Sequence, residues 1–468
     1  MNKITFLLCW ALSVCLSGCY MEKEPKLIKP ITSKVEAPKS ERVPKGVINH
    51  VATTQKIMAL TFNGLADEQT MDKLLNELNR FDIKATFFLP GIRVAEDPDL
   101  AKEIIKQGHT IQNNTLNHVL PDKLKYEEAY IELALANRVF KEHLNIEPKY
   151  ARTRSGDSSD SFQEAAAQLN MEVVTYTINP KDTQMQSAEE IADYIRRFAN
   201  RGAIIELNTY INPEVIRAIP LIYQYASADG YTLTTLEEVH QTNYLVDELV
   251  DTNNLAVNTD YKNSRPAIIE KFSTLEKEIA LTFDDWASDE TITAVLDILD
   301  NYNVKSTFFL IGKGVETNPQ LARLIIERGH EVASHSYNHK VITTMNPRAL
   351  QEDLVKNDQI LTHALQIKPL NYFRPAQGVL DEVTAKAIGA TGVDYIVLYD
   401  VASLDWDLSL SEDEVYNRVV SQVGPGSIVD MHILDESHTV SVLPRIIEHL
   451  QQNGYKFKKI SEMIPKNK

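Results

Sequence analysis

The chain has 468 residues, 43% of them hydrophobic and 24% charged, which is the composition of a folded protein and not of a disordered or fibrous one. This length predicts roughly two to four domains, each able to bury its own core. The formal net charge of -17 gives a surface that repels phosphate backbones, so nucleic acid is not expected as a partner. After residue 18 no apolar run reaches the roughly 20 residues that cross a bilayer, which excludes a polytopic membrane protein.

The N-terminus has the layout of a secretory signal. Asn2 and Lys3 precede the apolar stretch 4–16, and Leu16-Ser-Gly-Cys19 follows. This string resembles the bacterial lipoprotein box, in which the cysteine becomes the lipidated first residue. We therefore expect residues 1–18 to be a signal peptide and a lipid on Cys19 to hold the exported chain at the extracytoplasmic face of a bacterial membrane. An ordinary secretory signal that contains cysteine is the alternative.

Residues 19–50 are predicted to be the anchor and a flexible linker. They are rich in Lys, Glu and Pro and contain few large apolar residues, so they cannot bury enough surface to fold. Between Lys23 and Lys45 the segment carries seven Lys or Arg against three Asp or Glu, opposite in sign to the rest of the chain. Basic residues beside an anchor favour an anionic lipid surface. A charged spacer of accidental sign is equally compatible with this composition.

The rest of the chain is a duplication. Residues 56–109 align without a gap on residues 277–330, and roughly 23 of these 54 positions are identical. The correspondence continues with small gaps through Arg152 and Arg374 to Gly202 and Gly426. The repeat therefore predicts two tandem domains, at 51–242 and 272–465, joined by a linker over 243–271.

Each copy alternates apolar runs with amphipathic stretches. In the second copy, 279–283 is predicted to be a buried strand, and the helix after it places Ile292, Val295, Leu296 and Leu299 on one face. Repeated strand and helix units imply a parallel sheet, here one closed into a barrel, with reactive residues at the carboxyl ends of the strands. The expected fold class is α/β, with two tandem parallel (β/α) barrels.

Acidic and imidazole side chains stand at such positions. Asp284 and Asp285 directly follow the first strand of the second copy, and His335 and His339 follow a later apolar segment. Two histidines four residues apart can face one metal, and a carboxylate completes a three-ligand site that leaves positions for water and substrate. Adjacent acids are usually a solvated turn and a histidine pair is usually structural, so it is their joint occurrence that indicates a metal centre.

The second copy also resembles the polysaccharide deacetylase family, the NodB-homology group known as carbohydrate esterase family 4, over nearly all of residues 277–465. Five motifs of that family occur in order, at Thr282 to Trp286, His335 to His339, Arg374 to Gly378, Ser403 to Trp406 and Asp430 to His432. The resemblance implies a distorted parallel barrel that binds one divalent metal through Asp285, His335 and His339. Zinc is usual, with cobalt, nickel or manganese as alternatives, and the usual substrates are N-acetylated glucosamine polymers.

The resemblance also assigns roles in amide hydrolysis, which needs an activated water, a stabilised oxyanion and a proton donor. Asp284 corresponds to the general base, and Arg374 orients it and keeps it ionised. His432 corresponds to the acid that protonates the departing amine, paired with Asp405. Trp406 would form a wall of the acetyl pocket. A structural ion pair for Arg374 and Asp405, and simple core packing for Trp406, are the alternatives.

Several positions depart from the family pattern. Trp286 stands where the family usually has Gly, so its ring either stacks on a sugar at the mouth of the site or narrows the entrance. Ala402 replaces the first Asp of the Asp-x-x-Asp-Trp motif. Asp430 stands where the family has Leu, and because it precedes His432 by two residues on a strand it should point into the acetyl pocket. A carboxylate there costs desolvation unless it is paired.

The first copy keeps the fold signal and loses the site residues. Polar or small residues replace both acids, one histidine ligand and the acid histidine, namely Asn63, Gly64, Asn114 and Asn208, whereas His118 and Arg152 remain. One ligand cannot hold a catalytic metal, so this copy is expected to be degenerate.

The function expected from these motifs is that of a surface-anchored, metal-dependent hydrolase. It would remove N-acetyl groups from a cell-wall or extracellular polysaccharide. A glycan-binding or scaffolding lipoprotein, inactive in both domains, is the alternative. The sequence does not indicate the oligomeric state.

Overall fold

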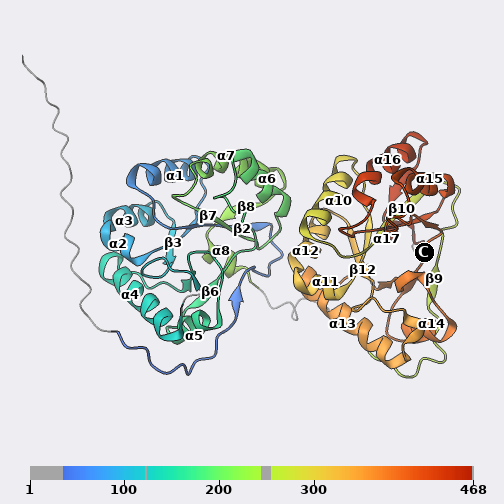
Figure 1. Cartoon of the computed structure of the whole chain (residues 1–468), viewed down its shortest axis with the longest axis horizontal. Coiled ribbons are helices and arrows are strands. Elements are labelled where there is room, and N and C mark those ends of the chain that lie inside the picture. The colour runs from blue at the N-terminus through green and yellow to red at the C-terminus, as the bar shows by residue number, and fades with distance from the viewer. Residues whose placement is uncertain (1–34, 122–123, 244–254, 466–468) are drawn as a thin grey trace, which may run out of the picture.

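The computed structural model describes residues 35–121, 124–243 and 255–465. The signal peptide expected at 1–18 and the lipidation site expected at Cys19 lie outside these residues. The described residues form two α/β domains side by side, the first drawn from blue to green and the second from yellow to red in Figure 1. Within them, no helix combines the length and apolar character that crossing a membrane requires.

The first domain contains one sheet in the strand order β1-β6-β5-β4-β3-β2-β7, with β8 pairing to β2. Its strands are β1 (Val47–Ile48), β2 (Ile57–Asn63), β3 (Thr86–Leu89), β4 (Thr110–Asn113), β5 (Tyr150–Ala151), β6 (Glu172–Val174), β7 (Ile204–Asn208) and β8 (Thr232–Thr234). Its helices are α1 (Glu68–Arg80), α2 (Gly91–Glu96), α3 (Pro98–Lys106), α4 (Tyr126–Leu144), α5 (Asp160–Gln168), α6 (Ala188–Phe198), α7 (Glu214–Ala228) and α8 (Leu236–Gln241).

The second domain repeats this plan in the order β15-β16-β10-β11-β12-β13-β14-β9, with β17 pairing to β10. Its strands are β9 (Ala267–Ile269), β10 (Glu278–Asp285), β11 (Thr307–Leu310), β12 (Glu331–Ser334), β13 (Tyr372–Phe373), β14 (Tyr395–Val397), β15 (Val401–Ala402), β16 (Ile428–His432) and β17 (Lys456–Lys458). Its helices are α10 (Asp289–Asn301), α11 (Gly312–Thr317), α12 (Pro319–Glu327), α13 (Pro347–Leu365), α14 (Glu382–Gly389), α15 (Glu412–Gln422), α16 (Thr439–Gln452) and α17 (Ile460–Met463).

The expected α/β class is confirmed, since each domain is a parallel sheet covered by helices. Helix α10 begins at the N-cap Ser288, whose side chain accepts from the backbone N–H of Thr291, and it buries the apolar face predicted from the sequence. The two cores repeat the same contact, because Phe62 stacks on Phe87 at 5.1 Å and Phe283 stacks on Phe308 at 5.0 Å. Parallel strands bring their carboxyl ends to one edge of each sheet, where the site residues lie.

Each sheet begins earlier in the chain than the expected domain boundaries. Strand β1 pairs with β6 and lies within the segment expected to be a linker, and β9 pairs with β14 and lies before residue 272. Leu255 is also buried against the second domain. These segments join the sheets mainly through main-chain hydrogen bonds over two or three residues, which is too short for any hydrophobic periodicity to reveal.

Charged and polar side chains join the two domains. The Arg201 guanidinium lies 3.2 Å from a carboxylate oxygen of Glu327 at the end of α12, and both side chains are largely buried. Tyr231 Oη donates to the same carboxylate at 3.2 Å, and Arg201 also donates to the carbonyl of Leu365 at 3.0 Å. Glu327 thus collects two partners from the other domain, so the duplicated halves are packed against each other through specific polar contacts.

Removal of this shared carboxylate should loosen the pair of domains. In Glu327→Ala, Arg201 and Tyr231 lose their acceptor while remaining partly buried, which should lower the free energy of unfolding by about 2 kcal/mol. Denaturant unfolding of the full chain measures this loss. Glu142→Ala, which removes an exposed glutamate of α4, is the matched control and should change stability by less than about 0.5 kcal/mol. Equal effects of the two substitutions would contradict a specific interface.

Candidate active site

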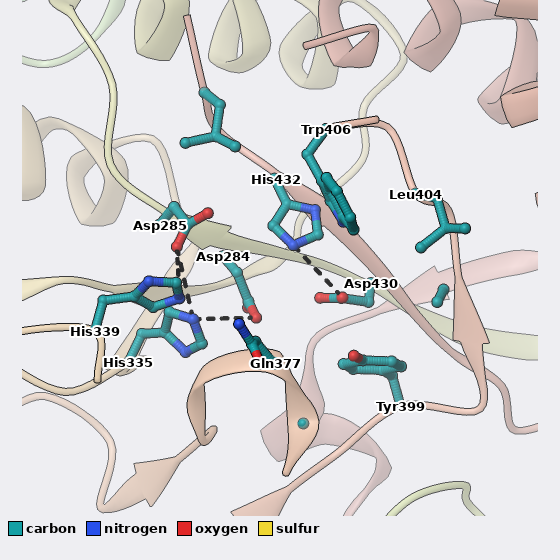
Figure 2. Close-up of a pocket in the computed structure, with 13 residues that line it drawn as sticks. Asp284, Asp285, His335, His339, Gln377, Tyr399, Leu404, Trp406, Asp430 and His432 are labelled. Atoms are coloured by element: carbon teal, nitrogen blue, oxygen red, sulfur yellow. Dashed lines mark ion pairs between the residues drawn. The ribbon is translucent and has the colours of Figure 1, made fainter. Parts of the chain in front are cut away.

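The carboxyl ends of four strands of the second domain bring the predicted site residues together. Asp284 and Asp285 end β10, His335 follows β12, Arg374 follows β13 and His432 ends β16. The acids and histidines border a cavity of about 720 Å³, shown in Figure 2, and Arg374 lies buried behind it. The cavity is lined by Asp284, Asp285, His335, His339, Gln377, Gly378, Tyr399, Ala402, Leu404, Trp406, Asp430, His432 and Leu434.

Three side chains have the spacing of metal ligands. One oxygen of Asp285 lies 3.6 Å from His335 Nε2 and 3.4 Å from His339 Nε2. Ligand atoms about 2.1 Å from a tetrahedral ion are about 3.4 Å apart, so the three groups can hold one divalent metal. Figure 2 shows both imidazoles turned toward Asp285. This is the ligand set that the sequence predicts.

The surroundings of these ligands also suit a cation. His335 Nδ1 donates to the carbonyl of Arg374 at 2.9 Å, which leaves the lone pair of Nε2 facing the site. The same Asp285 oxygen is buried and has no hydrogen-bond partner in the described part of the chain. A buried carboxylate oxygen without a donor is costly, and a metal ion would satisfy it. Asp285 and His339 have φ values of 82° and 52°, so the backbone is held in a disfavoured left-handed conformation at both ligands.

Arg374 is fully buried and neutralises the acids behind the metal ligands. Its Nη1 donates to Asp284 at 2.7 Å, to Asp430 at 3.0 Å and to the Thr282 hydroxyl at 2.8 Å. Burial alone would raise the pKa of Asp284, but the positive charges of Arg374 and the nearby histidines hold it below its usual range. Asp284 also lies 3.6 Å from His335 Nε2, beside the metal ligands, so the expected base is ionised and next to the reaction centre.

Asp430 is paired, which meets the condition that a buried carboxylate at this position requires. One oxygen accepts from Arg374, and the other lies 3.8 Å from His432 Nε2 and faces the cavity. Burial and the neighbouring charge of Asp284 raise the pKa of Asp430 well above its usual range. Arg374 is therefore the partner without which a carboxyl group at this buried position would be costly.

His432 and Asp405 form a buried dyad. His432 Nδ1 lies 2.7 Å from one oxygen of Asp405, and the His432 backbone N–H donates to the other at 2.8 Å. Thr439 Oγ1 also donates to Asp405, and Ser403 Oγ donates at 2.8 Å. Burial would lower the pKa of His432, but the hydrogen bond to Asp405 and the neighbouring acids raise it above its usual range. The imidazole can therefore carry a proton into the cavity.

The two predicted tryptophans differ in position. Trp406 is 49% exposed and lines the cavity, where Figure 2 shows its ring beside His432. Trp286 is not among the lining residues. Its ring packs on Gly314 of α11, where a Cβ would come within 2.3 Å of the indole, and against the hydrophobic core. The structure therefore places Trp286 at the edge of the core, away from the cavity wall.

Sequence reasoning did not single out Tyr399, Leu404 and Leu434 as cavity residues. Tyr399 follows β14, and the other two flank Asp405 and His432 in the chain. Apolar and aromatic residues at strand ends are common, so only their neighbours in the motifs could have indicated them.

The first domain lacks two of the three candidate metal ligands found in the second domain. Gly64 and Asn114 occupy the positions of Asp285 and His335. The ring of Tyr210 covers Gly64, where a Cβ would lie 2.4 Å from it, and Tyr210 Oη lies 3.4 Å from His118 Nδ1. Burial lowers the pKa of His118 to about 4. An aromatic side chain thus covers the place of the ligand that is missing.

Two acids of the first domain were not predicted and repeat positions of the second. Asp182 accepts from the backbone N–H and the side-chain amide of Asn208, at 2.7 and 2.8 Å, as Asp405 does from His432. Glu206 lies 3.6 Å from the buried Arg152, as Asp430 lies beside Arg374. Extension of the repeat alignment would have found both residues.

Glu206 should make folding depend on pH. Burial raises the pKa of Glu206 from 4.5 to about 7, although Arg152 opposes the shift. The folded state then binds more protons than the unfolded state between these values, so stability should fall as pH rises from about 4.5 to about 7. Over this pH range the free energy of unfolding of the parent chain should fall by on the order of 3 kcal/mol because of Glu206, and Glu206→Gln should remove this decrease.

Denaturant unfolding at pH 5 and pH 8 measures this difference for the parent chain and the variant. Glu189→Gln, at an exposed position of α6, is the matched control. An unchanged pH dependence in Glu206→Gln would contradict the assignment.

Comparison with known proteins identifies the family. The profile described as "Polysaccharide deacetylase" matches residues 50–174 and 271–396, together more than half of the chain. A peptidoglycan-N-acetylglucosamine deacetylase of Bacillus cereus is 32% identical over 195 residues, covering 41% of this chain and 70% of the relative. A peptidoglycan-N-acetylmuramic acid deacetylase of Bacillus subtilis is 29% identical over 206 residues, covering 42% of this chain and 78% of the relative.

The chain is also similar to a relative that it spans over a smaller share and to a solved structure. A bifunctional xylanase/deacetylase of Pseudobutyrivibrio xylanivorans is 34% identical over 40% of this chain, which spans only 31% of that relative. The crystal structure of a carbohydrate esterase family 4 pseudoenzyme from Bacillus anthracis is 29% identical, with a TM-score of 0.40, over 43% of this chain and 70% of that one. Since the family profile matches both copies, the chain belongs to the polysaccharide deacetylase family and carries two of its domains in tandem.

Proposed function

We propose that the second domain is a metal-dependent deacetylase that removes N-acetyl groups from an N-acetylhexosamine polysaccharide of the cell wall or extracellular matrix. The observation that carries this proposal is the arrangement of Asp285, His335 and His339 as a ligand set in the same cavity as the buried Asp284 and the protonatable His432. Relatives whose names specify peptidoglycan deacetylation support the substrate class. The first domain, without these groups, would serve binding or spacing.

A divalent metal, with zinc as the first expectation, would be held by Asp285, His335 and His339 and would supply an acidified water and polarisation of the amide carbonyl. Asp284 accepts the proton of the attacking water, because it is the ionised oxygen nearest these ligands. Arg374 fixes the orientation of that carboxylate through its 2.7 Å hydrogen bond.

His432 completes the reaction on the other side of the cavity. Its Nε2 carries the proton, because Nδ1 is engaged by Asp405 at 2.7 Å. As the C–N bond breaks, the amine nitrogen takes this proton and the acyl carbon keeps the oxygen of water, so the products are acetate and a free amino sugar. Trp406 at the cavity wall would exclude water beside the acyl group.

Acetate release tests this function directly. The full mature chain is assayed with chitooligosaccharides, peptidoglycan and poly-N-acetylglucosamine, with zinc, cobalt, nickel or manganese added and with a chelator. Chelator-sensitive release supports the proposal. Binding of a glycan without acetate release under every metal would favour the alternative, a glycan-binding or scaffolding protein.

The two copies provide a matched test of the metal site. His335→Ala or His339→Ala should reduce bound metal from one ion per chain to a trace. Loss of a residue that only orients a metal ligand lowers activity ~10- to 100-fold, and loss of a ligand itself should lower it further. His118→Ala, at the position of His339 in the first copy, should change neither quantity. Elemental analysis of the purified chain measures the metal content. The assignment fails if His335→Ala retains one metal per chain.

We further propose that a lipid on Cys19 holds the chain at the extracytoplasmic face of the membrane, and the lipoprotein-like string at 16–19 supports this. Cys19→Ser should therefore move the protein from the membrane fraction to the soluble fraction, because the proposed lipid would be attached through the Cys19 thiol. Cys15→Ser, within the expected leader, should leave the distribution unchanged. Fractionation followed by immunoblotting measures both, and membrane retention of Cys19→Ser would contradict the anchor.

A further inference from the structure

The two oxygens of Asp430 have different surroundings. Oδ1 accepts from Arg374 at 3.0 Å. Oδ2 accepts no hydrogen bond within the described ranges, and His432 Nε2 lies 3.8 Å away from it. Asp430 nevertheless lines the cavity, and Figure 2 shows its carboxyl group between His432 and Tyr399. One polar atom of the pocket therefore remains open to a hydrogen bond from a ligand.

The first domain shows how this fold can close the same position. There Asn179 lies beside Glu206, next to the bridge between Ile178 and Ile205, and its side-chain amide donates to Glu206 at 3.0 Å. In the second domain the register places Ala402 opposite Asp430. Alanine has no donor and leaves space, so the second domain lacks the internal partner that the first domain provides.

The loop above this position differs as well. In the first domain a Cβ on Gly156 would lie 2.2 Å from Glu206 Oε2, so the loop lies directly on the carboxyl group. At Gly378 in the second domain the nearest atom is instead the Tyr399 hydroxyl, at 3.0 Å from the Cβ position. The acid is covered in the first domain and faces the cavity in the second.

Asp430 also lies where the acyl group of a substrate would enter. On β16 it precedes His432 by two residues, which places it about 7 Å deeper along the strand on the same face. Since His432 is proposed to protonate the leaving nitrogen, the acyl substituent of a bound amide would extend below His432, toward Asp430. The neighbouring Leu404 and Trp406 enclose this part of the cavity. A methyl group there would leave Asp430 Oδ2 without a partner, whereas a hydroxyl group would supply one.

We propose that Asp430 is a specificity-determining residue that hydrogen-bonds a hydroxyl on the acyl group, so that the second domain prefers N-glycolyl to N-acetyl amino sugars. This inference rests on the proposed deacylase function and names its substrate class. The reaction has the same stoichiometry as deacetylation. Water adds to the acyl carbon, the C–N bond breaks, the nitrogen takes a proton, and glycolate leaves in place of acetate. A site built to hydrogen-bond a substrate hydroxyl discriminates strongly against the analogue that lacks it.

The ratio of kcat/KM for N-glycolyl and N-acetyl chitotetraose, measured on the full chain with added divalent metal, tests the inference. We expect a ratio of at least about ten for the parent chain. Asp430→Leu should reverse the preference and raise acetyl turnover, whereas Asp430→Asn, which can still hydrogen-bond, should keep the ratio above one. Each ratio is taken within one protein sample, so partial misfolding of a variant does not affect it. Glu206→Gln, at the same position of the first copy, should not change it.

A ratio of one in the parent chain, or an unchanged ratio in Asp430→Leu, would overturn the inference and show that Asp430 serves Arg374 alone. If neither substrate is turned over, the proposed function fails, and a binding measurement then decides the inference separately. Calorimetric titration of the Asp284→Asn protein with the two oligosaccharides should give at least about tenfold tighter binding of the N-glycolyl form. Equal affinities would overturn the assignment of Asp430.

Discussion

A guanidinium group without any exposed surface lies inside each of the two barrels, and the surrounding structure has to neutralise it. Arg152 and Arg374 are both fully buried and lie over a phenylalanine ring, at 4.0 Å from Phe88 and 4.1 Å from Phe309. A buried cation without an acid partner is strongly destabilising. In the second domain two carboxyl groups share the arginine. In the first, where Asn63 replaces the base, Glu206 is the acid that lies near it.

This constraint explains what the first copy kept and what it lost. The arginine and its acid remain because a buried cation needs an acid partner, whereas the candidate metal ligands have no such role in the interior of the first domain. The Asp182–Asn208 pair preserves the hydrogen bonds of the catalytic dyad with an amide that does not titrate near neutral pH. The first domain therefore has the hydrogen-bond geometry of the Asp405–His432 pair without a side chain that can transfer a proton.

The sequence predicted the parallel barrels, and it predicted which side chains meet as candidate metal ligands and as the Asp405–His432 pair, because each depends on local patterns repeated in two copies or on motifs at strand ends. It did not predict strands β1 and β9, whose two or three residues are held by main-chain hydrogen bonds and carry no periodic signal. It also placed Trp286 at the mouth of the site, whereas Gly314 on a neighbouring helix provides the surface on which the indole packs. The partner of Asp430 could not be named from the sequence, because Arg374 lies 56 residues away and meets Asp430 only in the folded barrel. Such contacts depend on tertiary structure.

The chain that precedes β1 is attached to the first domain, because Lys45 forms an ion pair with Glu172 and Tyr126 donates to the carbonyl of Pro38. With the proposed lipid at Cys19, the first domain would therefore lie between the membrane and the second domain. The cavity would then reach glycan strands about one domain diameter farther from the lipid surface than an anchored enzyme with a single domain could reach. A spacer needs only a folded body that is attached at both ends, and neither property requires a metal, a base or an acid.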